Sequence, residues 1–466
     1  MSTHHDIAVI GAGPAGGNAA LVAARAGLDV VLLDEQPVPG GQVWRGKSPS
    51  IHSAPQTPES QSGDALRQAL TESAVEQLTD ARVWDIRRQD DRWALQVLRN
   101  GESHEVAASA LILATGAREY VQPVPGWTTP GVIGLAGATA LFKQSLTLPG
   151  TRTVVSGTGP LVFYVASEIR RLGGEVAAVV TPNTRGEWAR ALPAMAGQPR
   201  LLGRGALWVA DLMLARVPIL WGHAISEVFG GNSVTGVRAR RLGENDPGQE
   251  FSADSVCVGH GLIPQIEAAQ MLGVHILHDP ALGGWVPEVQ PDGATRVDGL
   301  YLTGDGCGIR GATAAALQGV LTGARVARDM GKSTHMPSLR PWRRAAKFGR
   351  AMTALSQPRA SVAALTTDET IVCRCESLRR ADILAEIAIG AQSTNAVKSG
   401  RRAGMGPCGG KYCQTAIAAL IAAQTGKPLS EIAPPTPRPP LRPVPLSQAA
   451  GDFDYDDLPI PKPAPL

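Results

Sequence analysis

Four of the six cysteines in this chain fall between residues 373 and 413. Cys373 and Cys375 form a C-x-C pair, and Cys408 and Cys413 form a C-x4-C pair. Thiolates bind soft metals, so four of them suit either a structural zinc ion or an iron–sulfur cluster. Zinc ribbons usually use C-x2-C pairs, and the spacing therefore favours a [2Fe–2S] cluster held by all four cysteines. Zinc, or no metal at all, is the alternative.

The residues around the second cysteine pair suit a cluster of this kind. Glycines at 404, 406, 409 and 410 would let backbone N–H groups approach the sulfur atoms. Cys413 begins an Ala-rich stretch at 414–423, and the N-terminus of a helix favours thiolate over thiol. Between residues 371 and 415, seven Lys and Arg stand against three Asp and Glu. This excess of positive charge would offset a negatively charged cluster.

A second chemical motif lies near the N-terminus. Residues 11–16 form a G-x-G-x-x-G that follows an apolar run at 7–10 and precedes an Ala-rich stretch at 18–26. Another apolar run, 30–33, ends in Asp34 and Glu35. The spacing predicts a strand–turn–helix–strand unit that binds a dinucleotide, with its pyrophosphate at the helix N-terminus. Asp34 would accept a hydrogen bond from a ribose hydroxyl.

Three later motifs select FAD as that dinucleotide. They are a Gly-Gly-Gln at 40–42, an LILATG at 111–116 that ends a strand, and a YLTGDG at 301–306 in which the Asp would bind ribityl or phosphate groups. An Ala-rich helix at 312–324 would point its N-terminus at the isoalloxazine. The residues expected to hold FAD are Gly11, Gly13, Pro14, Ala15, Gly16, Asp34, Glu35, Gly41, Gln42, Ala114, Thr115, Gly116, Gly304 and Asp305.

The middle of the chain predicts a second, less complete dinucleotide fold. A strand at 153–156 leads into Gly157 and Gly159, but Val162 stands where a third glycine is usual. The next strand, 175–180, ends without an acid for a ribose 2′-hydroxyl. NAD(P) binding is one interpretation of this unit. A different nucleotide such as ATP, or an empty structural fold, is the other interpretation and the favoured one.

Two common chemistries are disfavoured by the residues present. Disulfide reductases of this fold need two neighbouring cysteines, whereas Cys257 and Cys307 stand alone in the first 330 residues. Both are interpreted as small, inert residues. His223, His260 and His275 are isolated, so none of them is a convincing general base.

Composition limits the remaining function classes. The chain has 466 residues with 44 basic and 41 acidic side chains, a balance that argues against nucleic acid as a partner. No apolar run approaches 18 residues, so no transmembrane segment is expected. No secretory leader is evident, and a cytoplasmic location is the expectation, with attachment to a membrane face through partners as an alternative.

The motifs imply an α/β protein with two Rossmann-like folds, the second inserted in the first. The predicted boundaries are residues 1–118 with 250–330 for the FAD domain, 119–249 for the second nucleotide domain, 331–365 for a linker and 366–430 for a small helical [2Fe–2S] domain. Residues 431–466 contain eleven prolines and predict an extended arm, either free in solution or anchored by aromatic and aliphatic side chains. Those anchors would be Phe453, Tyr455, Leu458 and Ile460.

The whole pattern resembles one family. The flavoprotein motifs, GGQVWRG at 40–46, VPGWTTPGV at 124–132, VCRCE at 372–376 and RAGMGPCGGKYC at 402–413 are similar to those of the A-type subunit of opine oxidases. Subunits of this type also occur in D-hydroxyproline and dye-linked proline dehydrogenases and in hydrogen cyanide synthase. The cysteine module resembles the bacterioferritin-associated-ferredoxin type. Gly409 departs from the pattern, since relatives usually have Gln there, but it is not an expected ligand.

The resemblance implies a subunit that works beside a second FAD subunit, which oxidises an amine. It also implies FMN between subunits in some relatives and, in some, a small ferredoxin-like subunit. We therefore expect an electron-transferring flavoprotein subunit that delivers electrons to a quinone or another carrier. A self-sufficient NAD(P)H oxidoreductase and a non-catalytic scaffold are the two rival hypotheses.

Overall fold

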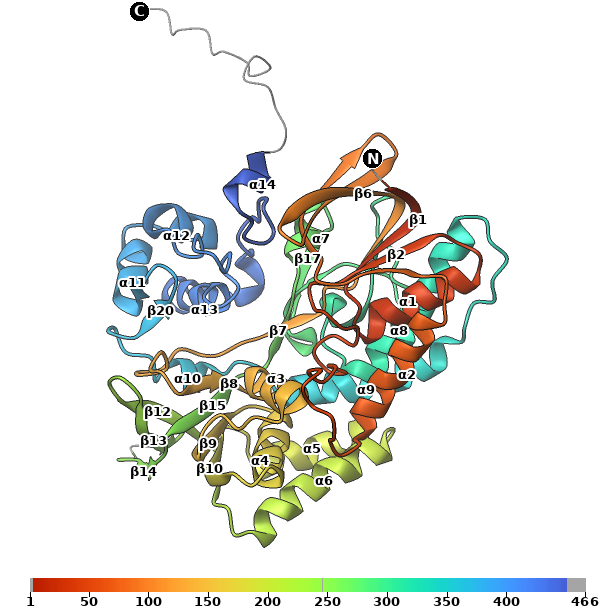
Figure 1. Cartoon of the computed structure of the whole chain (residues 1–466). Coiled ribbons are helices and arrows are strands. Elements are labelled where there is room, and N and C mark those ends of the chain that lie inside the picture. Colours follow the sequence, from red (N-terminus) through yellow and green to blue (C-terminus); the bar gives the residue numbers. More distant parts are fainter. Residues whose placement is uncertain (1–2, 245, 451–466) are drawn as a thin grey trace, which may run out of the picture.

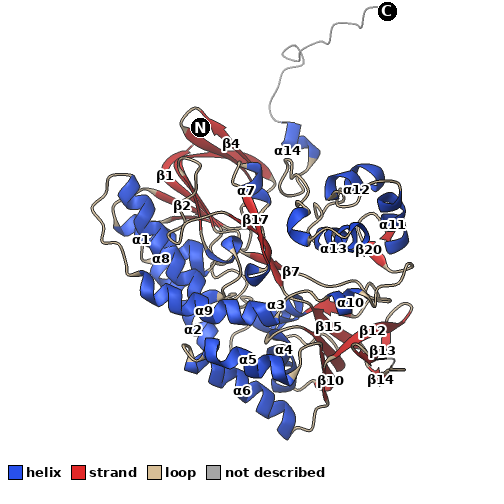
Figure 2. Ribbon diagram, turned by 180° about the vertical axis from the view of Figure 1, so that it is seen from behind, coloured by secondary structure: helices blue, strands red, loops and turns tan. Residues whose placement is uncertain are grey.

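The computed structural model describes residues 3–244 and 246–450. Figure 1 shows three parts: two dinucleotide folds built on separate sheets, and a small helical domain beside them. The same arrangement is visible from behind in Figure 2, where helices cover the strands of both folds. The expected fold class is confirmed. Phe453, Tyr455, Leu458 and Ile460, the predicted anchors of the arm, lie outside the described residues.

The first sheet is built around β1 (Thr3–Ile10), which pairs in parallel with β2 (Val30–Leu33) and β6 (Glu102–Leu113). Every residue of β2 is buried, as in a parallel strand covered on both faces. The strand order is β3-β2-β1-β6-β5-β4, with β19 also on β6. The other strands are β3 (Glu76–Leu78), β4 (Arg82–Gln89), β5 (Arg92–Arg99) and β19 (Leu300–Leu302).

Helices α1 (Pro14–Arg25) and α8 (Ala312–Asp329) pack unusually closely against this sheet and against each other. A Cβ at Gly319 would lie 2.1 Å from the carbonyl oxygen of Ala15. Real side chains do not approach a backbone oxygen so closely, so this helix contact requires glycine. The contact brings the end of α8 that follows Asp305 to the loop that precedes α1.

The second sheet has the strand order β11-β10-β9-β15-β8, and all its neighbours are parallel. Its strands are β8 (Val132–Gly134), β9 (Arg152–Gly157), β10 (Glu175–Thr181), β11 (Ile219–Trp221) and β15 (Ser255–Gly259). Its helices are α3 (Leu135–Ser145), α4 (Leu161–Arg171), α5 (Arg185–Met195) and α6 (Pro199–Leu214). An antiparallel sheet of β12 (His223–Gly230), β13 (Val234–Arg241) and β14 (Gln249–Ser252) adjoins them.

We expected the chain to return to the first fold at residue 250, but it returns later, at residues 262–264. Strand β15 lies inside the second sheet, between β9 and β8. The crossing is made by β7 (Ala117–Glu119) and β16 (Leu262–Pro264), which pair antiparallel between the two folds. The predicted boundary therefore assigned the strand at 255–259 to the wrong domain. The sequence of a buried strand does not indicate which of two sheets it joins.

The predicted linker at 331–365 is largely helical. It contains α9 (Leu339–Leu355) and α10 (Ala360–Ala363), and α9 contacts α5, α8 and the turn η1 (Pro280–Leu282). Residues 345, 346, 349, 353 and 355 of α9 are buried. The segment is thus a packed element that joins the two folds. The remaining elements here are α2 (Pro58–Thr71), α7 (Glu267–Met271), β17 (Ile276–Asp279), β18 (Gly284–Pro287) and η2 (Gly304–Cys307).

The cysteine module forms its own small core around Ile383, Val397, Ile417 and Ile421. Its elements are β20 (Ile371–Cys373), β21 (Leu378–Arg379), α11 (Arg380–Ala388), α12 (Thr394–Arg401), α13 (Gln414–Thr425) and η3 (Leu429–Glu431). Beyond it, the Pro-rich segment returns to the first fold and ends in α14 (Leu446–Ala450). Within the described ranges, none of the helices is long and apolar enough to cross a membrane.

The α1–α8 contact gives a stability prediction. Gly319→Ala places a methyl group 2.1 Å from the Ala15 oxygen, and we expect a loss of about 1–3 kcal/mol in the free energy of unfolding. Gly203→Ala in α6 is the matched control, because nothing lies within 4 Å of its Cβ and alanine favours helix by about 1 kcal/mol. Thermal unfolding measures both. Equal or higher stability for Gly319→Ala would contradict the close packing.

Candidate functional site

The first glycine motif forms a tight turn between β1 and α1. Gly11 has φ +105°, and a Cβ there would lie 2.4 Å from the Ala114 carbonyl oxygen. A Cβ at Gly16 would lie 1.8 Å from the Gly11 oxygen, so the helix begins directly against the turn. Gly13 lines the cavity, a Cβ there would meet only the Gly41 Cα at an ordinary 3.8 Å, and no side chain caps the helix that it precedes. This leaves the N-terminus of α1 accessible to a phosphate group.

The two acids after β2 have different surroundings. The Asp34 carboxylate accepts backbone N–H groups from Ala12 at 2.6 Å and Gln36 at 2.8 Å. Burial raises the pKa of Asp34, although these two hydrogen bonds oppose the shift. Glu35 instead pairs with Arg442, with 3.2 Å between Oε2 and Nε. Asp34 thus fixes the glycine turn, and its remaining lone pairs face the same cavity as Glu35.

Asp305 occupies the corresponding place below α8. Its Oδ1 accepts N–H groups from Arg310 at 2.8 Å and Gly311 at 3.0 Å, and burial raises its pKa. The neighbouring Thr303 hydroxyl is buried and has no hydrogen-bond partner among the residues the structure describes. It lines the cavity, where a bound cofactor would give it a partner.

These residues surround one cavity of about 1460 Å³. Every residue predicted to hold FAD lines it except Gly16, which lies behind the turn. The size of the cavity, the uncapped start of α1 and the buried Thr303 hydroxyl without a partner fit a dinucleotide. The residues present therefore fit FAD, which would bring flavin redox chemistry to this cavity.

The second glycine turn is already filled by protein. A Cβ at Gly157 would lie 1.8 Å from the Gly259 oxygen, and one at Gly159 would lie 1.9 Å from the Ser356 hydroxyl. The Gly159 N–H donates to the buried Asn183 side chain at 3.0 Å. Asn183 in turn donates to the Leu355 carbonyl at 2.9 Å, at the end of α9. Gly157 and Gly159 do not line the large cavity, although Thr158 and Pro160 of the same turn do. The end of α9 packs against the two glycines.

The four late cysteines meet as two pairs. Cys373 shares a hydrogen bond with Cys413, which is the main reason that its pKa falls to about 6. Cys375 has a side-chain hydrogen bond with Cys408. Across residues 3–244 and 246–450, no three or more His, Cys, Asp or Glu side chains converge on a single ion position. Two thiols per iron is the donor set of a [2Fe–2S] cluster, so the cysteines fit it.

Backbone N–H groups and glycines shape this site as the sequence suggested. N–H groups of Gly404, Cys375 and Glu376 donate to the Cys373 sulfur. A Cβ at Gly406 would lie 2.2 Å from the Cβ of Cys375, so this approach of the two stretches of chain requires glycine. Cys413 is the N-cap of α13. The N–H groups favour the charged form of Cys373. The hydrogen bond with Cys373 and burial instead raise the pKa of Cys413.

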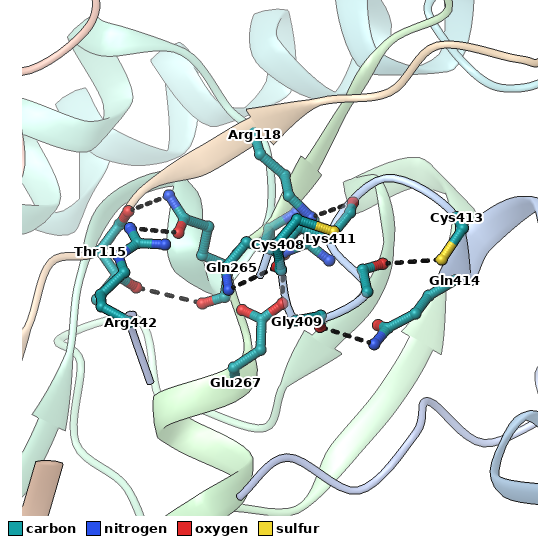
Figure 3. A network of polar contacts seen from close by, with 12 residues as sticks. Thr115, Arg118, Gln265, Glu267, Cys408, Gly409, Lys411, Cys413, Gln414 and Arg442 are labelled. Carbon is teal, nitrogen blue, oxygen red and sulfur yellow. Dashed lines mark hydrogen bonds and ion pairs between the residues drawn. The ribbon is translucent and has the colours of Figure 1, made fainter. Parts of the chain in front are cut away.

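The cysteine domain is held against the cavity by a set of contacts that sequence reasoning missed. Figure 3 shows Arg118, which donates to the Lys411 carbonyl at 2.9 Å and pairs with Glu267 at 2.7 Å. The Lys411 ammonium donates to the Cys408 carbonyl at 3.2 Å. Arg118 lies two residues after the LILATG motif, but nothing in the sequence indicates that it contacts residue 411. Arg374, Lys411 and Tyr412 line the same cavity as the FAD residues.

Glu119 is a second residue that the sequence did not reveal. It lies in the cavity wall, where its carboxylate accepts backbone N–H groups at the start of α3, including that of Ala136 at 2.9 Å. Burial raises its pKa to about 8, and the N–H groups of residues 135–137 limit the shift. Burial thus favours the protonated carboxyl group, and the N–H groups oppose it by favouring the carboxylate.

The comparisons with known proteins agree with these two sites. Residues 5–331 match the pyridine nucleotide-disulphide oxidoreductase family, and residues 371–423 match the BFD-like [2Fe-2S] binding domain. The A-type subunit of opine oxidase from Agrobacterium tumefaciens (strain Ach5) is 32% identical over 97% of this chain and 92% of its own length. The HcnB subunit of hydrogen cyanide synthase from Pseudomonas aeruginosa is 30% identical over 94% of this chain and 97% of its own.

Among solved structures, L-proline dehydrogenase from P. horikoshii has the same fold with a TM-score of 0.73. It is 21% identical, over 96% of this chain and 79% of that one. Thioredoxin reductase from T. acidophilum matches with a TM-score of 0.54 and 19% identity, over 71% of this chain and 99% of its own.

The cysteine assignment predicts a spectroscopic result. Cys408→Ser should remove the visible absorption of the cluster and leave the flavin absorption, because Cys408 lies outside the dinucleotide turns. Cys257→Ala is the control, since Cys257 is buried in β15 and far in sequence from the cluster residues. An unchanged cluster spectrum in Cys408→Ser would overturn the ligand assignment.

Glu119 predicts a pH dependence of stability. Its usual pKa is 4.5 and its folded pKa is about 8, so the folded chain binds more protons than the unfolded chain between these values. Stability should therefore fall as pH rises through this window. Melting temperatures of wild type and Glu119→Gln across this range of pH measure the effect. The Gln variant should show a flatter profile, and equal slopes would contradict the assigned cause.

Proposed function

The chain belongs to the pyridine nucleotide-disulphide oxidoreductase family and is a relative of the A-type opine oxidase subunit. We propose that it is the electron-transferring subunit of a multi-subunit dehydrogenase. In this function a partner FAD subunit oxidises a C–N bond of an amine substrate. The substrate would be an opine, D-hydroxyproline, proline or a similar amino acid. This chain receives the electrons and passes them to a quinone or another carrier.

The observation that carries the proposal is the shared cavity. The turns that fit FAD and the loop that follows Cys408 line one continuous space, with Lys411 and Tyr412 on the cluster side. Flavin couples two-electron to one-electron chemistry, and an iron–sulfur cluster carries one electron at a time. Arg118 and Glu267 hold the two sides of the cavity together.

The names of the relatives support the proposal. Opine oxidase and hydrogen cyanide synthase are both assembled from subunits, and the similar chain in each is named as one subunit. The solved structure with the same fold is called an L-proline dehydrogenase. Opines and proline are both amino acids or their derivatives, which is why we assign the substrate to this class.

The histidines considered above have structural surroundings, which suits substrate chemistry on a partner. The His260 ring accepts the Gln122 N–H at 3.0 Å, and burial lowers its pKa to about 4. The His223 ring contacts the Trp221 carbonyl at 2.9 Å. His275 is exposed beside Glu288. None of these three faces the cavity.

Helix α6 offers a surface for that partner. Leu207, Met213 and Leu214 are 69%, 64% and 85% exposed, and only Leu212 of this helix is fully buried. The same helix forms part of the cavity wall through residues such as Trp208 and Val209. A partner that covers α6 would bury these apolar side chains and close the cavity to water.

The experiment is gentle purification of the tagged chain from its native host, with mass spectrometry of the proteins that accompany it. We expect a second flavoprotein at a fixed ratio. Leu207→Asp/Leu214→Asp should reduce its recovery about tenfold, because charged groups at an apolar interface cost about 1–3 kcal/mol or more. Ile389→Asp is the control, since Ile389 is 79% exposed on the cysteine domain.

Two results would contradict this function. One is a chain that purifies alone from its host and whose flavin is bleached rapidly by NADH, which indicates a self-contained reductase. The other is a chain without bound flavin after gentle isolation, which indicates a scaffold. The covered second glycine turn, with Ser356 against Gly159, supports the expectation that NADH reacts slowly.

A further inference from the structure

The segment after the cysteine domain spans two parts of the molecule. Its first residues belong to the cysteine domain: Ile432 is buried in that core and its carbonyl accepts the Trp285 indole N–H at 3.1 Å. The Thr394 hydroxyl donates to the Ala433 carbonyl at 2.9 Å. Thr436 contacts Asn395 through two hydrogen bonds of 3.0 Å. The chain is thus anchored as far as residue 436.

A few residues later the same segment is anchored to the first dinucleotide fold. The Leu441 N–H donates to the Trp84 carbonyl at 2.7 Å, and Arg82 donates to the Pro443 carbonyl at 3.2 Å. The Ser103 N–H donates to the Gln448 side chain at 2.8 Å. We call residues 437–448 the clasp. Figure 1 shows its end at α14 beside the first sheet, where hydrogen bonds join the clasp to Arg82 of β4 and Ser103 of β6.

Between its two anchors the clasp reaches the cavity. Leu441 and Arg442 both line it, on the side where β2 ends. Arg442 pairs with Glu35 at 3.2 Å and donates to the Gln265 side chain at 3.4 Å. Its side chain is 28% exposed, so the charge is held against Glu35 and Gln265 rather than in free solvent. Figure 3 shows Arg442 beside Gln265 and Thr115.

The position of Glu35 identifies which part of the cofactor the clasp would face. In dinucleotide folds the acid at the end of the second strand lies at the adenosine ribose. Asp34 holds that position, where its carboxylate accepts two backbone N–H groups, and Glu35 follows it directly. The cavity wall next to Glu35 is apolar, with Ala81, Val83 and Ile86, and Leu441 belongs to the same wall. An apolar wall beside a ribose-binding acid suits a purine ring.

We propose that the clasp forms the outer wall of the adenosine site, with Leu441 against the base and Arg442 against the ribose side. Because the clasp is continuous with the cysteine domain, a cofactor that orders it also fixes that domain at the cavity. By linkage, docking of the cysteine domain then strengthens FAD binding to the same degree. The inference concerns this chain alone and does not depend on the partner or the amine.

Arg442→Ala tests the proposal in the full-length chain. We expect about tenfold weaker binding of FAD to the apoprotein, measured by quenching of flavin fluorescence. Arg438→Ala is the matched control, because Arg438 is an exposed arginine of the same segment. The cluster absorption should survive in both variants, since neither arginine contacts a cysteine. An FAD affinity close to that of wild type in Arg442→Ala would overturn the proposal.

Hydrogen exchange gives an independent readout. FAD should slow amide exchange at residues 441–448 and in the cysteine domain of wild type, and this protection should be lost or strongly reduced in Arg442→Ala. FAD-dependent protection confined to the first glycine turn and Asp34 would show that the clasp is only a structural attachment. Failure of partner co-purification leaves both measurements unaffected, so this test is separate from that of the proposed function.

Discussion

The ion pair between Arg118 and Glu267 is the contact on which the functional arrangement depends. Both side chains are largely buried, at 12% and 15% exposure, and Arg118 also donates to the Lys411 carbonyl. Arg118 follows the turn that ends β6, whereas Lys411 belongs to the loop of the second cysteine pair. A charge that is buried and shared in this way is costly to leave unpaired. The cysteine domain is therefore fixed at the cavity rather than attached by a free linker.

The two dinucleotide folds have divided their roles. The first keeps an open glycine turn, a free helix N-terminus and, among the residues described, a cavity wall in which Thr303 has no partner. In the second, Asn183 and Ser356 occupy the space around the turn, and α9 packs across it. The second fold still lines the cavity through α3, where Glu119 meets the helix N-terminus, through α4 and α5, and through the exposed helix α6.

Local features were predictable from the sequence because their causes are local. The apolar run 30–33 forms β2 without change, and the first glycine turn and the Asp305 turn line one cavity. The four late cysteines also gather, but Cys373 meets Cys413 and Cys375 meets Cys408, so each pairs across the two motifs. Contacts between distant segments were not predictable. Arg118 and Lys411 are 293 positions apart, and Glu35 and Arg442 are 407 apart. The sequence of helix α9 resembles that of a linker. The side chains on its buried face find their packing partners only in the folded chain, on α5 and α8.

We propose that the flavin site and the cysteine site form one electron path within one chain. Flash reduction of the flavin in the purified holoprotein, followed at the cluster absorption, tests this path directly. We expect the cluster to bleach with a rate constant independent of protein concentration, and Arg118→Ala to slow it. A rate that rises in proportion to protein concentration would show that electrons pass only between molecules, and would contradict an electron path within the chain.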